Sequence, residues 1–307
     1  MNELITSTPP QVSIDAAGLV ASFFSGKNAL TLKAYSRDLA HFTKFVGAAE
    51  LVDSAKLLLV KNQGQANALV ISYKNQLIDE GRAPATINRK LAALKSLVKM
   101  ARVVGLCSFT LEVSGVEAET LRDTRGPGKE GVDKLLKMVE LGTDKKSKRD
   151  LAMLHLLYGM ALRRGEVCSL NLEHVEKTEG ALWIMGKSRK QRQRVTMPDK
   201  AKEALLGWLE ARGSEPGPLF VALDTAAYGK RLTGDGLCRV VKKLGKKAGV
   251  TVKPHGLRHA AITRALDVTN GDIRKVRQFS RHKSHDLLIK YDDNRKDFAK
   301  EISNMVY

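Results

Sequence analysis

Apolar side chains recur every three or four residues over long stretches of this chain, and this spacing constrains the fold more than any other feature. Leu39 and Phe42 follow it within residues 30–46, and residues 83–105 repeat the pattern. Such a stripe lines the buried face of an amphipathic α-helix. The spacing therefore predicts that the first hundred residues form a compact bundle of about four helices, at 14–25, 30–46, 62–80 and 83–105.

The helical pattern stops after residue 108 and resumes near residue 129. Residues 109–122 have no clear period, and Gly126, Pro127 and Gly128 follow them, which is a composition typical of loops. The sequence therefore predicts four parts: a flexible N-terminus at 1–12, a helical domain at 13–108, a linker at 109–122 and a second domain at 123–307.

The second domain combines further helices with one short hairpin. Residues 182–185 and 195–197 are apolar or β-branched, which favours paired strands, and a polar loop opens at Gly186 between them. Residues 146–170 predict a buried helix, a turn and another helix. The remaining helices are predicted at 129–141, 199–213, 234–248, 256–268, 271–280, 283–291 and 295–305. The fold class is thus mainly α with a small β-hairpin, in which an α+β domain follows a helical bundle.

The chain is strongly basic. Its 307 residues contain 52 Lys and Arg against 33 Asp and Glu, for a net charge of +19. Most of the excess lies in the second domain, since residues 1–120 have 13 basic and 10 acidic side chains, whereas residues 121–307 have 39 and 23. An excess of this size favours a polyanionic partner, most often nucleic acid, with an anionic membrane surface as the competing interpretation.

Several other classes of protein lack support in the sequence. No apolar run is long enough to span a bilayer, and residues 1–10 lack the features of a secretory signal. Cys107, Cys168 and Cys238 are far apart and form no CxxC pair, so we expect neither zinc nor disulfides, in a reducing compartment such as the cytoplasm. Because no phosphate-binding glycine motif and no carboxylate cluster occurs, we expect no cofactor and no metal.

The loop of the hairpin is rich in positive charge. Residues 186–194 read GKSRKQRQR, with five basic side chains in nine positions. A solvated turn is one interpretation, but five like charges repel one another unless an anion binds, which favours contact with a DNA backbone or groove. The helices of the first domain also carry basic faces, which either solvent or DNA covers. We assign DNA contact to Arg189, Lys190, Arg192 and Arg194 in the hairpin, and to Arg37, Arg89, Lys90 and Lys95 in the first domain.

Arg163 and Arg164 directly follow the apolar run YGMAL, where a guanidinium is costly to bury without a partner. Glu166 follows three residues after Arg163, so one interpretation is an ion pair that locks a helix turn. The other is a guanidinium directed at a phosphate, whose oxygens suit its planar donors. The sequence of this turn leaves both interpretations open.

Histidines, an arginine and a tyrosine gather towards the C-terminus. In KPHGLRHAAI, His255, Arg258 and His259 occupy a predicted helix start. Residues 255 and 258 share a helix face there, and a helix start favours anions. His282 then precedes Tyr291 by nine positions. A single tyrosine in a helix is usually a core residue, so the argument for function depends on the ordered set.

The ordered set resembles the catalytic pattern of the tyrosine recombinases, the phage integrase group that includes the Xer and Cre recombinases. ALRRGEVCSL resembles the family's first-arginine box, MGKSRKQR its hairpin lysine box, HGLRH its H-x-x-R box and SRHKSHDLLIKYDDN its final box. The likeness covers about residues 130–295, and residues 13–108 resemble the family's core-binding domain. One box alone is weak, whereas all of them in this order are specific. The residues that match are Arg163, Lys187, His255, Arg258, His282 and Tyr291.

The resemblance implies a site-specific recombinase that cuts and rejoins DNA through a 3′-phosphotyrosyl link, with neither metal nor ATP. Tyr291 would be the nucleophile. Arg163 and Arg258 would stabilise the charge of the transition state. Lys187 would protonate the leaving 5′-oxygen. His255 would move the tyrosine proton or hold the phosphate. His282 would hydrogen-bond a nonbridging oxygen. Glu166 matches the acidic position that follows the first arginine in the family pattern.

The resemblance also implies partners. The two domains would clamp double-stranded DNA with inverted-repeat core sites, as a dimer on each site and a tetramer in the synapse, with accessory DNA-bending proteins and a nucleoid-associated location in the cytoplasm. Because residues 1–12 are few, we expect no arm-binding domain of the kind that some integrases have. Phe298, Ile302 and Met305 give the C-terminal segment an apolar face that packs either on a neighbouring protomer or on its own domain.

One position departs from the family pattern. Arg281 precedes His282 where the family usually has Gly, which alters the approach to His282 or adds a phosphate contact. Two other functions share most of these features, a DNA-binding regulator without activity and a type IB topoisomerase. The joint presence of Tyr291, Lys187 and His255 favours an enzyme over the regulator. The two-domain layout favours a recombinase over the topoisomerase, by analogy.

Overall fold

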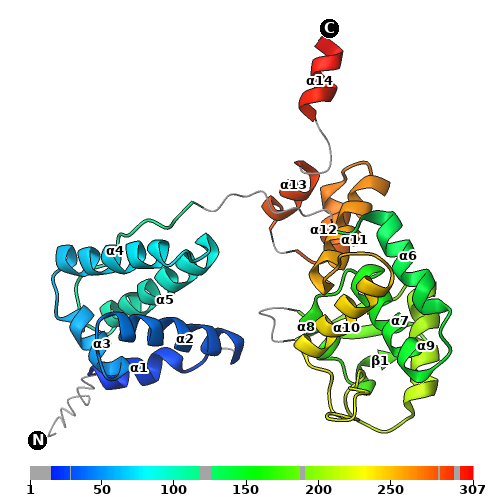
Figure 1. The fold of residues 1–307 in the computed structure, drawn as a ribbon, viewed down its shortest axis with the longest axis horizontal. Helices are drawn as coiled ribbons and strands as arrows, with labels where there is room; N and C mark the ends of the chain where they lie inside the picture. The colour runs from blue at the N-terminus through cyan, green and yellow to red at the C-terminus, as the bar shows by residue number, and fades with distance from the viewer. Residues whose placement is uncertain are drawn as a thin grey trace, which may run out of the picture. The chain divides into compact units, whose positions relative to one another are not determined.

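The computed structural model describes residues 15–27, 29–117, 126–186, 191–282, 284–293 and 298–306. The chain divides into two compact units, Met1–Leu121 and Arg122–Tyr307 (Figure 1). Each unit has a hydrophobic core of its own. The fold class predicted from the sequence is confirmed, since helices dominate the described residues and their one sheet is small. Within those residues no helix is both long and apolar enough to cross a membrane.

The described residues of the first unit form a bundle of five helices. Phe42 and Tyr73 meet edge to face in its core, with ring centroids 5.2 Å apart. One of the five, α3, was not predicted, because its nine residues make only about two and a half turns and offer few periodic positions. The helices are α1 (Ala16–Phe24), α2 (Ala29–Phe45), α3 (Leu51–Leu59), α4 (Gln63–Asp79) and α5 (Pro84–Val103).

The segment that follows α5 belongs to the first unit, which corrects the predicted start of the linker. Phe109, Leu111 and Val113 are buried in the core of this unit. The Asn88 side chain on α5 also binds both the backbone N–H and the carbonyl of Val116, each at 2.8 Å. Residues 109–116 are therefore packed onto the bundle, and residues 118–125 of the predicted linker lie outside the described residues.

The second unit combines helices with an antiparallel sheet in the order β1-β2-β3. Strands β2 and β3 are the two arms of the predicted hairpin, and Trp183 pairs with Arg194 across them. The elements are α6 (Gly128–Glu140), α7 (Lys145–Tyr158), α8 (Arg164–Cys168), a 3-10 turn η1 (Leu172–His174), β1 (Val175–Glu176), β2 (Ala181–Met185), β3 (Arg192–Thr196), α9 (Asp199–Arg212), α10 (Gly234–Lys247), α11 (Pro254–Val268), α12 (Ile273–Ser280), α13 (Asp286–Asp293) and α14 (Phe298–Val306).

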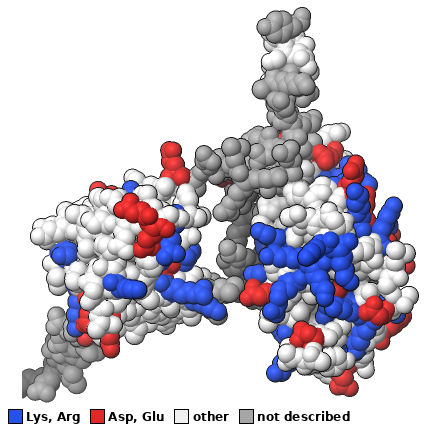
Figure 2. All heavy atoms as spheres, in the orientation of Figure 1, with Lys and Arg blue, Asp and Glu red and all other residues white. Residues whose placement is uncertain are grey.

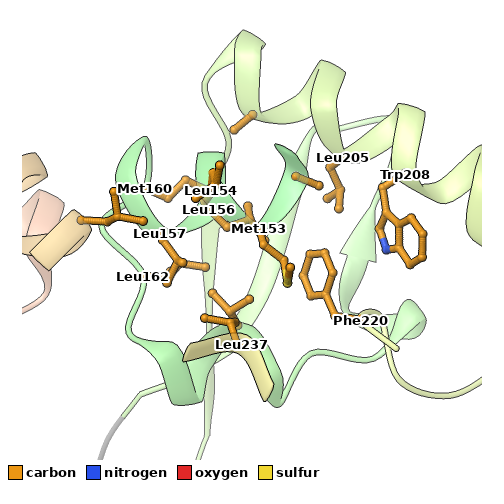
Figure 3. Close-up of a cluster of buried hydrophobic side chains, with 14 of the residues drawn as sticks. Met153, Leu154, Leu156, Leu157, Met160, Leu162, Leu205, Trp208, Phe220 and Leu237 are labelled. Carbon is orange, nitrogen blue, oxygen red and sulfur yellow. The ribbon is translucent and has the colours of Figure 1, made fainter. Parts of the chain in front are cut away.

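The main core of the second unit lies between α7 and α9 (Figure 3). Trp208 and Phe220 stack there with ring centroids 6.4 Å apart, and the Trp208 indole N–H donates to the Leu219 carbonyl at 2.9 Å. This hydrogen bond satisfies the one polar group of a fully buried ring. Because α7 is buried along most of its length, the core fixes the turn that follows α7.

A smaller hydrophobic cluster joins α11, α12 and α13 to that turn. Its buried members include Ala161 after α7, Ile262 on α11, Val276 on α12 and Tyr291 on α13. Three helices and one turn, widely separated in the sequence, therefore meet at one place, and they bring the candidate functional residues with them.

Candidate active site

Arg163 stands in the turn between α7 and α8, where its side chain closes on Glu166. Arg163 Nη1 donates to Glu166 Oε1 at 2.8 Å, and the Arg163 backbone N–H donates to Oε2, also at 2.8 Å. The Glu166 side chain is only 4% exposed, whereas that of Arg163 is 29% exposed. The ion pair left open by the sequence is therefore present, and the Arg163 side chain remains partly exposed.

Arg258 on α11 is buried, with 1% of the residue exposed. Its Nη1 donates to the Ala161 carbonyl and its Nη2 to the Ser280 carbonyl at 2.6 Å. Burial, followed by the charges of Arg163 and Arg281, lowers the pKa of the Arg258 guanidinium to about 9. The group remains a cation at neutral pH, held by backbone acceptors from two other parts of the fold.

His282 lies directly beside Arg258. Its Nε2 is 3.3 Å from Arg258 Nη2, and its Nδ1 is 2.9 Å from Ser280 Oγ. Burial, with the charges of Arg258 and Arg163 next in effect, lowers the pKa of His282 to about 4. The imidazole is therefore neutral at pH 7, and its Nε2, which faces a guanidinium, must be the acceptor.

Tyr291 on α13 is 6% exposed and packs against this group. Its ring centroid is 6.2 Å from that of His282 and 5.0 Å from that of His259. Burial raises the pKa of the Tyr291 phenol to about 12, against the opposing charges of Arg258 and Arg163. The phenol thus carries its proton at neutral pH, and a base must take it before the oxygen attacks.

His255 and His259 form a pair of rings on α11, with centroids 4.1 Å apart and planes nearly perpendicular. His255 is exposed, whereas His259 is partly buried and contacts both His255 and Tyr291. No role is predicted for His259 from the sequence. The signal was its spacing, because residues 255 and 259 are four apart and share one face of a helix.

The predicted hairpin contacts divide into those that the structure describes and those that it does not. Lys187, Arg189 and Lys190 lie outside the described residues. Arg194 on β3 forms an ion pair with Glu176 at 2.7 Å, and Arg192 Nη1 donates to the Trp183 carbonyl at 3.3 Å. Both arginines retain exposed surface, so both stay candidates for DNA contact.

The predicted contacts of the first unit need one correction, at Lys90. Its side chain is 8% exposed, and its ammonium lies 3.7 Å from the buried carboxylate of Asp38, which Arg89 also binds. Burial raises the pKa of Asp38 and lowers that of Lys90. Inside the bundle, each of the two charges is therefore compensated by the other. Lys90 is thus a core residue, whereas Arg37, Arg89 and Lys95 are exposed.

Positive charge also gathers on a helix for which the sequence predicts no DNA contact. Figure 2 shows Lys and Arg crowded over the part of the second unit where α8 and α10 lie. The buried residues Leu237 and Val241 face one side of α10. Spacing of three and four residues places the basic side chains on another face, and this was the signal in the sequence. The exposed members on α10 are Arg239, Lys242, Lys243, Lys246 and Lys247.

An open apolar pocket of about 400 Å³ lies where the end of α7 meets α11 and α12. Ala261, Ala265, Val268 and Phe279 supply much of its lining, and Arg264 and Lys275 are also among the lining residues. Val268 is 61% exposed although it is apolar. The pocket is a surface that an apolar side chain of another segment could fill.

The described residues thus place two guanidiniums, a neutral imidazole and a tyrosine in one group. Fixed cations of this kind stabilise the charge on a phosphate under attack, and a tyrosine oxygen is a suitable nucleophile. Within the described part of the chain, no three His, Cys, Asp or Glu side chains lie together as metal ligands would. The predicted residues Arg163, Arg258, His282 and Tyr291 are brought together, and Glu166 and Arg281 join them.

Known proteins with similar sequences share one family. Residues 128–297 match the model of the phage integrase family. A tyrosine recombinase of Synechocystis sp. is 40% identical over 282 residues, which covers 90% of this chain and 90% of the relative. Tyrosine recombinase XerC of Pseudomonas putida is 30% identical over 261 residues, which covers 82% of this chain and 81% of the relative.

Two integrases are among the solved structures that share the fold of this chain. A lambda integrase dimer bound to a COC′ core site has a TM-score of 0.65 at 17% identity, covering 92% of this chain and 96% of that one. The Tn1549 transposon integrase, in complex with transposon right end DNA, has a TM-score of 0.64 at 14% identity, covering 95% of this chain and 100% of that one.

Proposed function

The chain belongs to the phage integrase family and is a tyrosine-type site-specific DNA recombinase, and on that premise we propose that Tyr291 cuts and rejoins DNA through a 3′-phosphotyrosyl intermediate. The observation that carries this proposal is the approach of Tyr291 to His282, whose Nε2 lies 3.3 Å from the buried guanidinium of Arg258. A nucleophile and fixed cations in one cluster are the groups that phosphoryl transfer to a protein side chain needs.

The cleavage step exchanges one phosphate ester for another. The Tyr291 oxygen bonds to phosphorus while the bond from phosphorus to the 5′-oxygen breaks, and the 5′-oxygen leaves as a hydroxyl. The bond energy stays in the phosphotyrosyl link, so resealing by the 5′-hydroxyl of another strand needs no ATP. Because the pKa of Tyr291 is raised to about 12, its proton must pass to a base, a role we give to His255.

The two arginines would serve the transition state from different positions. Arg163 is partly exposed, so its guanidinium can turn to a nonbridging oxygen and donate through its planar fork. Arg258 is held by the carbonyls of Ala161 and Ser280, so it supplies charge that needs no reorganisation during the reaction. His282, neutral at pH 7, would donate a hydrogen bond from Nε2 to the same phosphate once DNA is bound, in the tautomer whose Nδ1 accepts from Ser280 Oγ.

We propose Lys187 as the general acid, on the basis of its position in the sequence. It is the first basic residue after β2, in the stretch GKSRKQRQR that leads into β3. A lysine among neighbouring cations loses its proton more readily than a solvated one, which suits a general acid for the 5′-oxygen.

We further propose that the chain binds inverted-repeat core sites as a dimer on each site and a tetramer in the synapse, with its two units clamped on the duplex. The basic face of α10 and the exposed arginines of the hairpin would contact the phosphate backbone. Such a protein would work in the cytoplasm at the nucleoid, where accessory DNA-bending proteins are available.

Contacts between protomers would use α14 and the apolar pocket. Ile302, Met305 and Val306 on α14 are 59%, 76% and 77% exposed, an exposure that favours a partner surface. We propose that α14 of one protomer fills the pocket beside Val268 on the next, because that pocket is apolar and its volume of about 400 Å³ admits large side chains.

Trapping of the covalent intermediate tests the proposed function. Wild-type protein and Tyr291→Phe would be mixed with genomic DNA of the source organism, quenched in detergent, and the protein-linked ends sequenced. We expect 3′-linked ends that cluster at an inverted repeat with wild type and none with Tyr291→Phe. Tight DNA binding with no adduct in either protein, even on nicked DNA that prevents resealing, would instead favour a regulator without activity.

A further inference from the structure

Arg281 has a backbone conformation that side chains other than glycine rarely adopt. It caps α12 in the left-handed region, with φ of 58°. A Cβ in this region is close to the following carbonyl, which is why glycine is preferred at such helix ends. Among the described residues, only Ala161 and Asn270 are other non-glycine residues with positive φ. The arginine must therefore gain something from its side chain that offsets this strain.

The Arg281 side chain is nearly buried, at 7% exposed, and is surrounded by acceptors. Nη1 donates to the carbonyls of Phe279 at 2.9 Å and Met160 at 3.2 Å, and Nη2 donates to that of Ala161 at 3.1 Å. Nη2 also lies 3.5 Å from Glu166 Oε2. The guanidinium thus ties the end of α12 to the turn that follows α7.

Two of the four acceptors of Arg281, Glu166 and the Ala161 carbonyl, are shared with the proposed catalytic arginines. Glu166 binds Arg163 through its other oxygen, Oε1. The Ala161 carbonyl accepts from Arg258 as well as from Arg281. Arg281 therefore contacts one partner of each catalytic arginine, from a third element of the fold.

The buried charge of Glu166 needs a compensating cation when Arg163 turns away. The carboxylate is 4% exposed, and a buried carboxylate that loses its cation is strongly disfavoured. Within the described residues, its two side-chain cations are Arg163 and Arg281. When Arg163 turns to a phosphate, Arg281 remains to compensate Glu166, together with the Arg163 backbone N–H at 2.8 Å.

We propose that Arg281 is a positioning residue for strand cleavage, which holds Glu166 and the Ala161 carbonyl so that Arg163 can leave its ion pair for the scissile phosphate while Arg258 stays in place. The proposal rests on the proposed function. It differs from a direct phosphate contact, because the Arg281 side chain is directed inward, onto protein carbonyls and Glu166.

The test measures cleavage and binding separately on one DNA. The probe is a nicked duplex built on the inverted repeat recovered from the adducts, on which the nick prevents resealing. For each variant, the rate of adduct formation at saturating protein and the Kd for the duplex are measured. The variants are Arg281→Gly, which removes the side chain and the backbone strain together, and Arg281→Lys, which keeps one charge. Asn270→Gly is the matched control, since it places a glycine in another left-handed turn.

We expect Arg281→Gly to lower the saturated rate about tenfold or more, with Kd within about twofold of wild type. Arg281→Lys should recover part of the rate, because a single ammonium can compensate Glu166 without reaching every carbonyl. Asn270→Gly should match wild type. If Arg281→Gly does not fold, Arg281→Lys carries the test through a loss of saturated rate with Kd unchanged.

Two results would overturn the proposal. One is a wild-type saturated rate in Arg281→Gly. The other is a loss confined to Kd, which would make Arg281 a DNA contact. Failure of the wild type itself to form an adduct on the nicked duplex would count against the proposed function, so the two failures are distinguishable.

Discussion

Arg258 and His282 are joined to each other and to the same third residue. Arg258 Nη2 lies 3.3 Å from His282 Nε2 and donates to the Ser280 carbonyl at 2.6 Å, while His282 Nδ1 lies 2.9 Å from Ser280 Oγ. Since Nε2 faces a donor, Nδ1 must carry the proton and donate to the hydroxyl. Arg258 therefore sets the tautomer of His282, and Ser280, which is fully buried, holds the orientation of the ring.

Ser280→Ala is expected to slow cleavage. The substitution removes the acceptor of Nδ1–H, and the loss of one such hydrogen bond, about 1 kcal/mol, corresponds to about a fivefold fall in rate. Adduct formation on the nicked duplex at saturating protein is the measurement. Ser54→Ala is the matched control, because Ser54 is also buried and hydrogen-bonded, but to Thr43 and Leu51 in the first unit. The control should lower Tm and leave the rate unchanged; equal rates for both variants would contradict the role given to Ser280.

Helical spacing in the sequence also indicates which charged residues are buried. Lys90 follows Ile87 by three residues and precedes Leu94 by four, so it falls on the buried face of its helix. Asp38 follows Tyr35 by three residues and precedes Phe42 by four, so it falls on the buried face of α2 in the same way. Two opposite charges on facing apolar stripes indicate a buried pair. Spacing alone therefore could have removed Lys90 from the DNA-binding set.

The packed segment after α5 had a signal of a different period. Phe109, Leu111 and Val113 alternate along the sequence, which is the period of an extended chain with one buried side. A search for helical spacing misses this pattern, so the segment was predicted as linker.

The candidate site itself separates what local sequence can predict from what it cannot. The boxes place Arg163, Arg258 and Tyr291 in order along the chain, and the structure brings them together. The contact of Arg281 with Ala161 spans 120 positions in the sequence. No local pattern predicts such a contact, because it depends on how α7 and α12 pack.

The second prediction concerns acid stability. The pKa of His282 is lowered to about 4 in the folded chain, from an ordinary value of 6.5. The unfolded chain therefore binds this proton first, so the stabilising contribution of the neutral imidazole is present above pH 6.5 and is lost as the pH falls from 6.5 to 4. The charges that face the ring and oppose its protonation are those of Arg258, Arg163, Arg281 and His259.

The measurement is Tm across that window for wild type and for His282→Asn. We expect the Tm advantage of wild type over the variant to shrink as the pH falls from 6.5 to 4. The comparison with the variant is needed because burial also lowers the pKa of His155 and His174, which destabilises both proteins in acid. A difference in Tm that stays constant across the window would contradict the lowered pKa of His282.

The third prediction separates the structural and catalytic parts of Arg258. Arg258→Lys keeps a positive charge, but one ammonium cannot reproduce the planar fork that reaches Ala161, Ser280 and His282. We expect a loss of about 3 kcal/mol in the free energy of unfolding and a fall in adduct formation of about a hundredfold.

Arg149→Lys is the control for that prediction. Arg149 is also buried, and it pairs with Asp150 at 2.6 Å and donates to the Val221 carbonyl at 3.1 Å. We expect a comparable loss in denaturant stability but adduct formation close to wild type. If the two variants lost cleavage equally, the effect at Arg258 would be one of stability alone.

The last prediction concerns assembly on DNA. Deletion of residues 296–307 removes α14 with its exposed Ile302 and Met305, and Val268→Glu places a charge at the rim of the apolar pocket. If α14 fills that pocket on a neighbouring protomer, both changes remove the same contact. We expect either one to abolish most of the cooperativity on a duplex with two half-sites and to leave binding to one half-site unchanged.

Val103→Glu is the control, because Val103 is 77% exposed but lies in the first unit. Gel-shift titrations on the two duplexes measure both quantities, and unchanged cooperativity in the deletion would place the contact elsewhere. Loss of cooperativity in the deletion but not in Val268→Glu would retain α14 as the contact and reject the pocket as its receptor.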